Sequence, residues 1–165
     1  RIDDLKNFGF ADEVTVIAPG INAKMNEFQA AFGLLQLKYI DKALDRRREI
    51  DTQYRQQLSS VTGILCPPLP AYTIYNFAYF PLLIGKQYPL SRDELYEKLR
   101  QNGIYSRRYF YPLISEFPMY RGLPSTEQSN LSTAKKVASQ VICLPIYPAL
   151  REVDQQEIIS LIAEV

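Results

Sequence analysis

The chain has 165 residues, of which 47% are apolar and 22% charged, and its formal net charge is +1. These values are typical of one globular domain of ordinary size. A near-neutral chain lacks the positive field that attracts nucleic acid or an anionic membrane, so we expect neither as a partner. No apolar run in the sequence is long enough to span a bilayer, and residues 1–10 lack the apolar core of a signal peptide. A cytoplasmic location is therefore the expectation.

The sequence contains no histidine. This excludes Ser-His and Cys-His nucleophile pairs, histidine-ligated zinc and the usual general base near neutral pH. Cys66 and Cys143 lie in apolar runs without metal-ligand spacing, so we expect buried free thiols and no metal site. Any chemistry must use a carboxylate, a lysine, a tyrosine or a cofactor.

The first part of the chain predicts short elements followed by two long helices. Residues 1–8 read as the end of a helix that Gly9 stops, and residues 14–17 as a short strand. Asn26 and Gln29 fit a capping box that opens a helix. Its apolar residues recur every three or four positions, which predicts one apolar stripe: Met25, Phe28, Phe32, Leu35 and Tyr39. A second helix is expected over residues 41–58, with Leu44, Ile50, Tyr54 and Leu58 turned inward.

The second part alternates strands and helices. Strands are expected over residues 77–84, 104–110 and 141–144, and helices over residues 91–102, 131–140 and 152–163. Residues 111–126 read as a loop rich in proline and aromatic residues. Pro81 cannot donate to a strand partner, so we expect an edge or a bulge there. The order predicts an α+β fold, a small sheet covered by helices.

Two segments could carry chemistry. In the first, Gly20 is followed by Asn22, Lys24 and a helix start, which could hold an anion, although a capped helix with a solvated lysine explains the same residues. In the second, alternation along a strand would send Arg107, Tyr109 and Tyr111 to one face. That face suits a phosphate or sugar ligand, or a single nucleic-acid strand, but an ordinary polar strand face is also consistent with it.

The first segment resembles a signature of the DegT-type nucleotide-sugar aminotransferases. The matching residues, in register, are Gly20, Asn22, Lys24, Met25, Gln29, Ala30, Ala31, Gly33, Gln36 and Leu37. Further similar elements follow in the same order along nearly the whole chain: Arg47-Arg48, Tyr54, Arg92-Asp93, Asn102-Gly103-Ile104, Tyr111-Pro112-Leu113 and Leu144-Pro145-Ile146-Tyr147-Pro148.

The resemblance implies the small C-terminal domain of a fold-type I aminotransferase, with long N-terminal helices packed on a small, mainly antiparallel sheet. Residues 1–25 would be a remnant of the large domain, which binds pyridoxal phosphate (PLP), and residues 26–165 the small domain. Asn22 would reach the PLP phosphate of the other subunit of a homodimer. Lys24, Arg107, Tyr109 and Tyr111 would contact a nucleotide sugar.

The implied reaction passes an amino group, with glutamate as the usual donor, through PLP to a nucleotide-linked keto sugar, in polysaccharide or deoxysugar biosynthesis. In the family, the lysine that bonds to PLP and the aspartate that pairs with its ring nitrogen precede the signature. We therefore expect no catalytic residue in this chain and no activity of the chain alone. The chain begins at Arg1 without an initiator methionine, which favours a cloned or proteolysed piece. The alternative is a stand-alone dimerising or regulatory domain. Many members have histidines where this chain has Phe110 and Ser115, so its hydrogen bonds to the sugar must differ.

Overall fold

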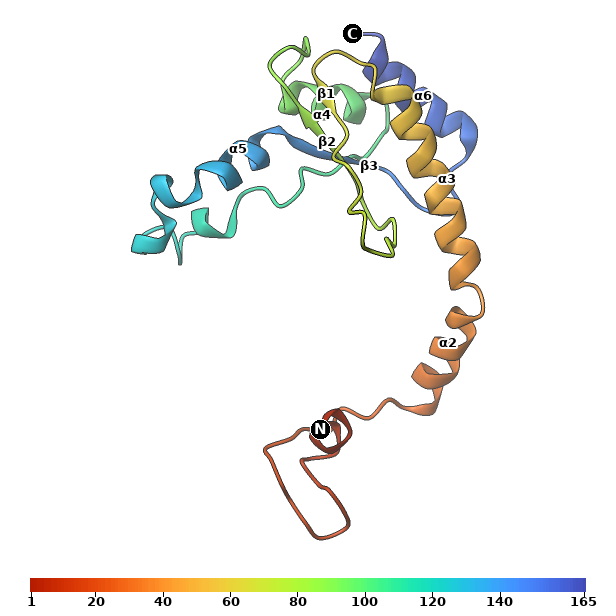
Figure 1. Cartoon of the computed structure of the whole chain (residues 1–165), viewed down its shortest axis with the longest axis vertical. Coiled ribbons are helices and arrows are strands. Elements are labelled where there is room, and N and C mark those ends of the chain that lie inside the picture. Colours follow the sequence, from red (N-terminus) through yellow and green to blue (C-terminus); the bar gives the residue numbers. More distant parts are fainter. The chain divides into compact units, whose positions relative to one another are not determined.

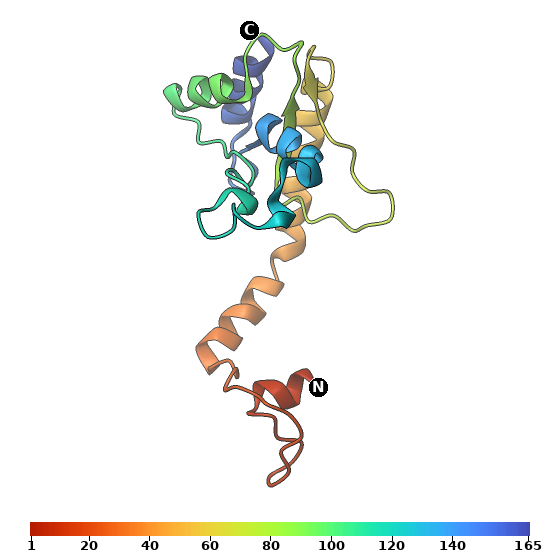
Figure 2. The ribbon, with the colours of Figure 1, turned by 90° about the vertical axis from the view of Figure 1, so that its left-hand side faces the viewer.

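The computed structural model describes residues 1–165, apart from the side chain of Gln128 (Figures 1 and 2). The chain divides into two compact units, residues 1–41 and residues 42–165. Within the described residues, no helix combines the length and the apolar character needed to cross a membrane.

The first unit begins with helix α1 (Ile2–Lys6), which ends before Gly9 as expected. Gly9 has a φ of +85°, and a Cβ there would lie 1.7 Å from the Ala18 carbonyl oxygen, so only glycine fits. The strand expected over residues 14–17 was wrong: the described backbone has only an isolated bridge between Phe10 and Val16. The physical reason is local, because the Asp12 carboxylate accepts hydrogen bonds from the backbone N–H groups of residues 14 and 15 and turns the chain.

Helix α2 (Glu27–Leu37) starts with the predicted capping box. The Asn26 side chain accepts a hydrogen bond from the Gln29 N–H at 2.9 Å, and the Gln29 side chain accepts one from the Asn26 N–H at 3.2 Å. The expected single apolar stripe is too narrow a description. Leu34 and Leu37 are as exposed as Phe32 and lie on other sides of the helix, so apolar side chains occupy most of α2 apart from the side of Gln29 and Gln36.

The second unit is built on a three-stranded antiparallel sheet in the order β1 (Ile64–Leu65), β2 (Phe80–Ile84), β3 (Val141–Leu144). Pro81 lies in the central strand, opposite Cys143. Both backbone groups of Cys143 bond to Arg107 on the other edge of β3, so the Pro81–Cys143 pair is not hydrogen-bonded. The Pro81 nitrogen therefore points toward the side of β1, which pairs only with residues 83 and 84. Pro81 was expected at an edge or a bulge; β2 is the central strand, but its side toward β1 is unpaired at Pro81, so the missing N–H costs no bond between strands.

Three helices and the sheet enclose the core: α3 (Ile40–Leu58), α4 (Arg92–Gln101) and α6 (Glu152–Ala163). Alternation along β2 buries Phe80, Leu82 and Ile84 against them. Helices α3 and α6 lie side by side (Figure 1), and the buried Gln155 of α6 donates to the Ile50 carbonyl of α3 at 2.9 Å. Helix α5 (Ser132–Gln140) lies against β2. Of the predicted inward positions of α3, Ile50, Tyr54 and Leu58 are buried, and Leu44 is half-buried.

The helices over residues 91–102, 131–140 and 152–163 and the strand over 141–144 are confirmed to within a few residues. Two other strands required correction. Residues 77–79 precede β2, because Phe77 has a φ of +50°, which no strand accepts. Residues 104–110 form no strand in the described backbone beyond the single bridge at Arg107. The loop that follows contains three short 3₁₀ helices: η1 (Ile114–Glu116), η2 (Pro124–Thr126) and η3 (Gln128–Leu131).

Candidate functional site

In the first unit, the backbone fixes the position of Asn22. Asn22 forms an isolated antiparallel bridge with Asn7, just after α1. The two segments approach so closely that a Cβ on Gly20 would lie 2.2 Å from the Gly9 nitrogen. Glycine at position 20 is therefore what allows Asn22 to be held beside the end of α1.

Lys24 follows this bridge by two residues and contacts Asn7. Its Nζ donates to the Asn7 side-chain oxygen at 2.9 Å and lies 4.7 Å from the centre of the Phe8 ring. Asn7 thus contacts both predicted residues, Asn22 through the backbone and Lys24 through its side chain. The sequence offered no signal for Asn7, since it stands outside the signature. The exposed Lys24 ammonium group beside the Asn7 amide suits the oxygens of a phosphate.

In the second unit, Arg107 is held by the open edge of β3. Its backbone N–H donates to the Cys143 carbonyl at 3.0 Å, and the Cys143 N–H donates to the Arg107 carbonyl at 2.7 Å. The Arg107 side chain is exposed, and its guanidinium lies 5.9 Å from the centre of the Phe110 ring. A cation fixed at its backbone and exposed at its tip can meet an anionic ligand.

The ring of Tyr109 packs against two other aromatic rings. The centre of its ring lies 4.9 Å from that of Tyr79 and 4.2 Å from that of Phe110. Desolvation, followed by the neighbouring Tyr79 and Cys143, raises the pKa of the Tyr109 phenol. Tyr109 therefore stays a neutral hydrogen-bond donor at physiological pH. Sequence reasoning missed Tyr79, because it was assigned to a strand without a role.

Tyr111 has a different environment. Its ring centre lies 4.7 Å from the Arg92 guanidinium and 5.4 Å from that of Arg108. Arg108 also forms an ion pair with Asp93 at 3.1 Å. The predicted common face of Arg107, Tyr109 and Tyr111 was therefore wrong.

The reason is the backbone. Phe110 has a φ of +36°, so the alternation of an extended strand does not apply across it. Arg107 and Tyr109 gather with Phe110, whereas Tyr111 packs against two arginines.

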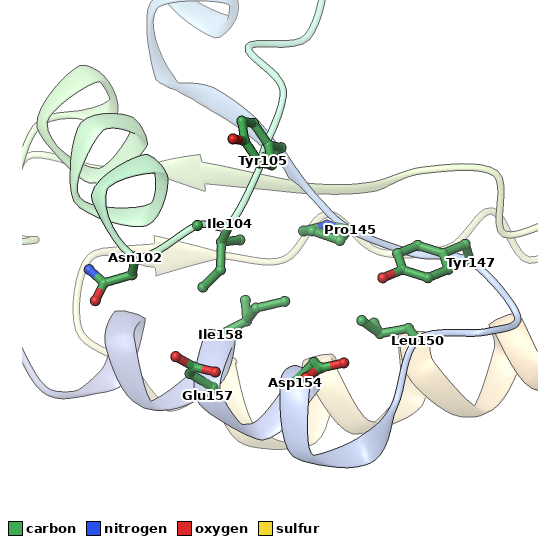
Figure 3. A pocket seen from close by; sticks show the side chains of 10 residues that line it. Asn102, Ile104, Tyr105, Pro145, Tyr147, Leu150, Asp154, Glu157 and Ile158 are labelled. Atoms are coloured by element: carbon green, nitrogen blue, oxygen red, sulfur yellow. The ribbon is translucent and has the colours of Figure 1, made fainter.

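A separate pocket of about 450 Å³ lies between the end of α4, the segment after β3 and α6 (Figure 3). Apolar side chains form its walls, and the carboxylates of Asp154 and Glu157 lie on its α6 side (Figure 3). Asp154 is already paired with Arg151. None of the five predicted site residues lines this pocket. The lining residues are Asn102, Gly103, Ile104, Tyr105, Pro145, Tyr147, Leu150, Asp154, Glu157 and Ile158. Among the described residues, no three carboxylate, thiol or imidazole groups gather as a metal ion would require.

Comparison with known proteins identifies the family. Residues 1–163 match the DegT/DnrJ/EryC1/StrS aminotransferase family. The chain belongs to this family. The dTDP-4-amino-4,6-dideoxy-D-glucose transaminase of Escherichia coli is 55% identical over 152 residues, which cover 92% of this chain and 41% of that protein. The transaminase of the same name from Shigella dysenteriae is 44% identical over 165 residues, which cover 100% of this chain and 44% of that protein.

Solved structures of family members share the fold. The structure of DesI in the presence of its TDP-sugar product matches 99% of this chain and 41% of its own, with a TM-score of 0.77 and 31% identity. The chain is thus similar to one part of a fold-type I sugar aminotransferase, as the sequence predicted. It spans about two-fifths of the length of these relatives. Aminotransferases of this family are in general PLP-dependent.

Proposed function

We propose that this chain is the C-terminal part of a PLP-dependent transaminase that forms or consumes dTDP-4-amino-4,6-dideoxy-D-glucose. The observation that carries the proposal is 55% identity to the Escherichia coli transaminase of that name across 92% of this chain. We also propose glutamate as amino donor, a cytoplasmic homodimer and a role in surface-polysaccharide or deoxysugar synthesis. Residues 1–25 would belong to the large domain and residues 26–165 to the small one.

The proposed roles are assigned within each unit separately. Asn22 would hold the PLP phosphate of the other subunit, and Lys24 would contact the phosphates of the cofactor or the substrate, since both residues are exposed and contact Asn7. Arg107 would bind a phosphate oxygen, and Tyr109 and Tyr111 would orient the sugar. PLP, when bound, would act as an electron sink for the carbon that carries the amino group. The donors present fit the phosphate end of this cofactor.

The activity test uses the full-length protein that contains these 165 residues. We expect it to transfer the amino group of dTDP-4-amino-4,6-dideoxy-D-glucose to 2-oxoglutarate, with glutamate formation as the readout. Arg107→Met should raise KM for the sugar nucleotide by about tenfold or more, because a charged hydrogen-bond partner is lost. Arg121→Met, a change of an exposed arginine in the 3₁₀-rich loop, is the matched control. No glutamate formed by the unmodified protein would refute the proposal.

The 165-residue chain alone is proposed to be inactive, with the lysine that bonds to PLP outside it. The chain spans 41% of the Escherichia coli relative, and its own Lys24 amine is bonded to Asn7. Incubation with PLP, reduction with borohydride and peptide mapping should label no lysine above background. Stoichiometric labelling of one residue, such as Lys24, would show that this chain bonds the cofactor itself.

A further inference from the structure

Arg92 is an unusual residue at the start of α4. Its side chain is buried, with 4% of its surface exposed, and it occupies the first position of the helix, where the helix dipole disfavours a cation. Its guanidinium donates to the carbonyls of Ala138 at 2.9 Å and Val141 at 3.3 Å. These bonds tie α4 to the junction of α5 and β3. The cost of burying a charge at a helix N-terminus needs a compensating role.

The guanidinium of Arg92 faces the ring of Tyr111 at 4.7 Å from its centre. Arg108 lies 5.4 Å from the same ring and 4.5 Å from the ring of Tyr96, which belongs to α4. The four side chains thus alternate between ring and cation. Because Arg92 is buried and bonded to two fixed carbonyls, it is the anchored end of this group.

One carboxylate makes the two like charges compatible. The Asp93 Oδ1 atom lies 2.8 Å from Arg92 Nε and 3.1 Å from Arg108 Nη1. The contact with Arg92 is electrostatic and lacks hydrogen-bond geometry, because Nε has no hydrogen-bond partner among the described residues. Asp93 engages the charge of Arg108, whereas the Arg107 guanidinium lies over the Phe110 ring.

We infer that Arg92 is a positioning residue that fixes the ring of Tyr111 for the sugar nucleotide, with Asp93 and Arg108 as its partners. This inference rests on the proposed function, since it deepens the role given to Tyr111. Arg92 does not touch the substrate in this account. It acts through Tyr111, and its removal should therefore change substrate affinity only while Tyr111 is present.

A double-mutant cycle in the full-length enzyme tests this dependence. Arg92→Lys keeps the charge but loses the planar fork, and should raise KM for the dTDP-sugar by about fivefold, the scale of coupling between residues in contact. KM for 2-oxoglutarate should stay the same. In a Tyr111→Leu background, Arg92→Lys should have no further effect. Arg100→Lys, on the exposed side of α4, is the matched control. An equal rise of KM in both backgrounds would overturn the inference.

A second readout does not depend on activity. In protein labelled with 3-fluorotyrosine, the ¹⁹F signal of Tyr111 is identified by its loss in Tyr111→Phe. Arg92→Lys should shift this signal, and Arg100→Lys should not. If the unmodified enzyme does not use the dTDP-sugar, the proposed function fails while this signal still reports on the contact. An unchanged Tyr111 signal in Arg92→Lys would refute the positioning role in either case.

Discussion

Cys143 lies on β3, where its backbone is flanked by Pro81 of β2 and by Arg107, and its side chain is buried. Burial raises its pKa to about 11 from an ordinary value of 9.0, although the nearby Arg107 acts in the opposite direction. The thiolate is therefore a minor species at neutral pH. Cys143 should behave as a small apolar core residue and not as a nucleophile.

The raised pKa makes stability depend on pH. Between the unfolded pKa near 9 and the folded value of about 11, the folded state keeps a proton that the unfolded state releases. The free energy of unfolding should therefore keep the full contribution of Cys143 below that window and fall as pH rises through it. Urea unfolding from about pH 8 to pH 10.5 should show this decline, and Cys143→Ala should make it shallower. Burial of Tyr88, whose pKa rises to about 12, adds to the decline only above about pH 10.

At the scale of elements, capping determined where helices begin. Ser91 and Glu94 exchange hydrogen bonds across the first turn of α4, and Asn26 and Gln29 do the same for α2. Such pairs depend on residues three positions apart, so the sequence predicted both helix starts. Strands behaved differently. The segment around Arg107 pairs with β3 at one residue only, and this depends on contacts with a distant part of the chain.

Removal of the α4 cap should cost a measurable part of stability. Ser91→Ala should lower the free energy of unfolding by about 1 kcal/mol, because one helix N–H loses its partner. Ser129→Ala, at an exposed serine outside this cap, is the control and should change the free energy of unfolding by less than about 0.5 kcal/mol.

Hydrogen bonds from Ser91 hold the pKa of Glu94 below its usual 4.5. The contribution of this carboxylate should be present above pH 4.5 and be lost as pH falls below it.

At the scale of the whole molecule, the first unit leaves much apolar surface open. Phe28 is 89% exposed, and Leu34 and Leu37 on other sides of α2 are each about two-thirds exposed. A helix with apolar side chains on most of its circumference is normally buried by neighbours. We therefore expect the isolated chain to self-associate through α2.

Sedimentation velocity can measure this association. Phe32→Asp should shift the chain toward the mass of the monomer, because a charge would have to be buried in the contact. Gln56→Asp adds the same charge to an exposed position of α3 and should leave the mass unchanged. Equal masses for Phe32→Asp and the unmodified chain would show that α2 is not the contact surface.

The sequence by itself determined the family signature, the helices and their caps, and the buried strand at residues 141–144. These depend on residue spacing within one helix or strand, which is visible along the chain. Only the tertiary structure decided how the candidate site is arranged. The positive φ of Phe110 separates Tyr109 from Tyr111, and Arg92, 19 positions from Tyr111 in sequence, comes within 4.7 Å of its ring. Contacts of this kind arise when α4, α5 and β3 pack together, and no local pattern encodes that packing.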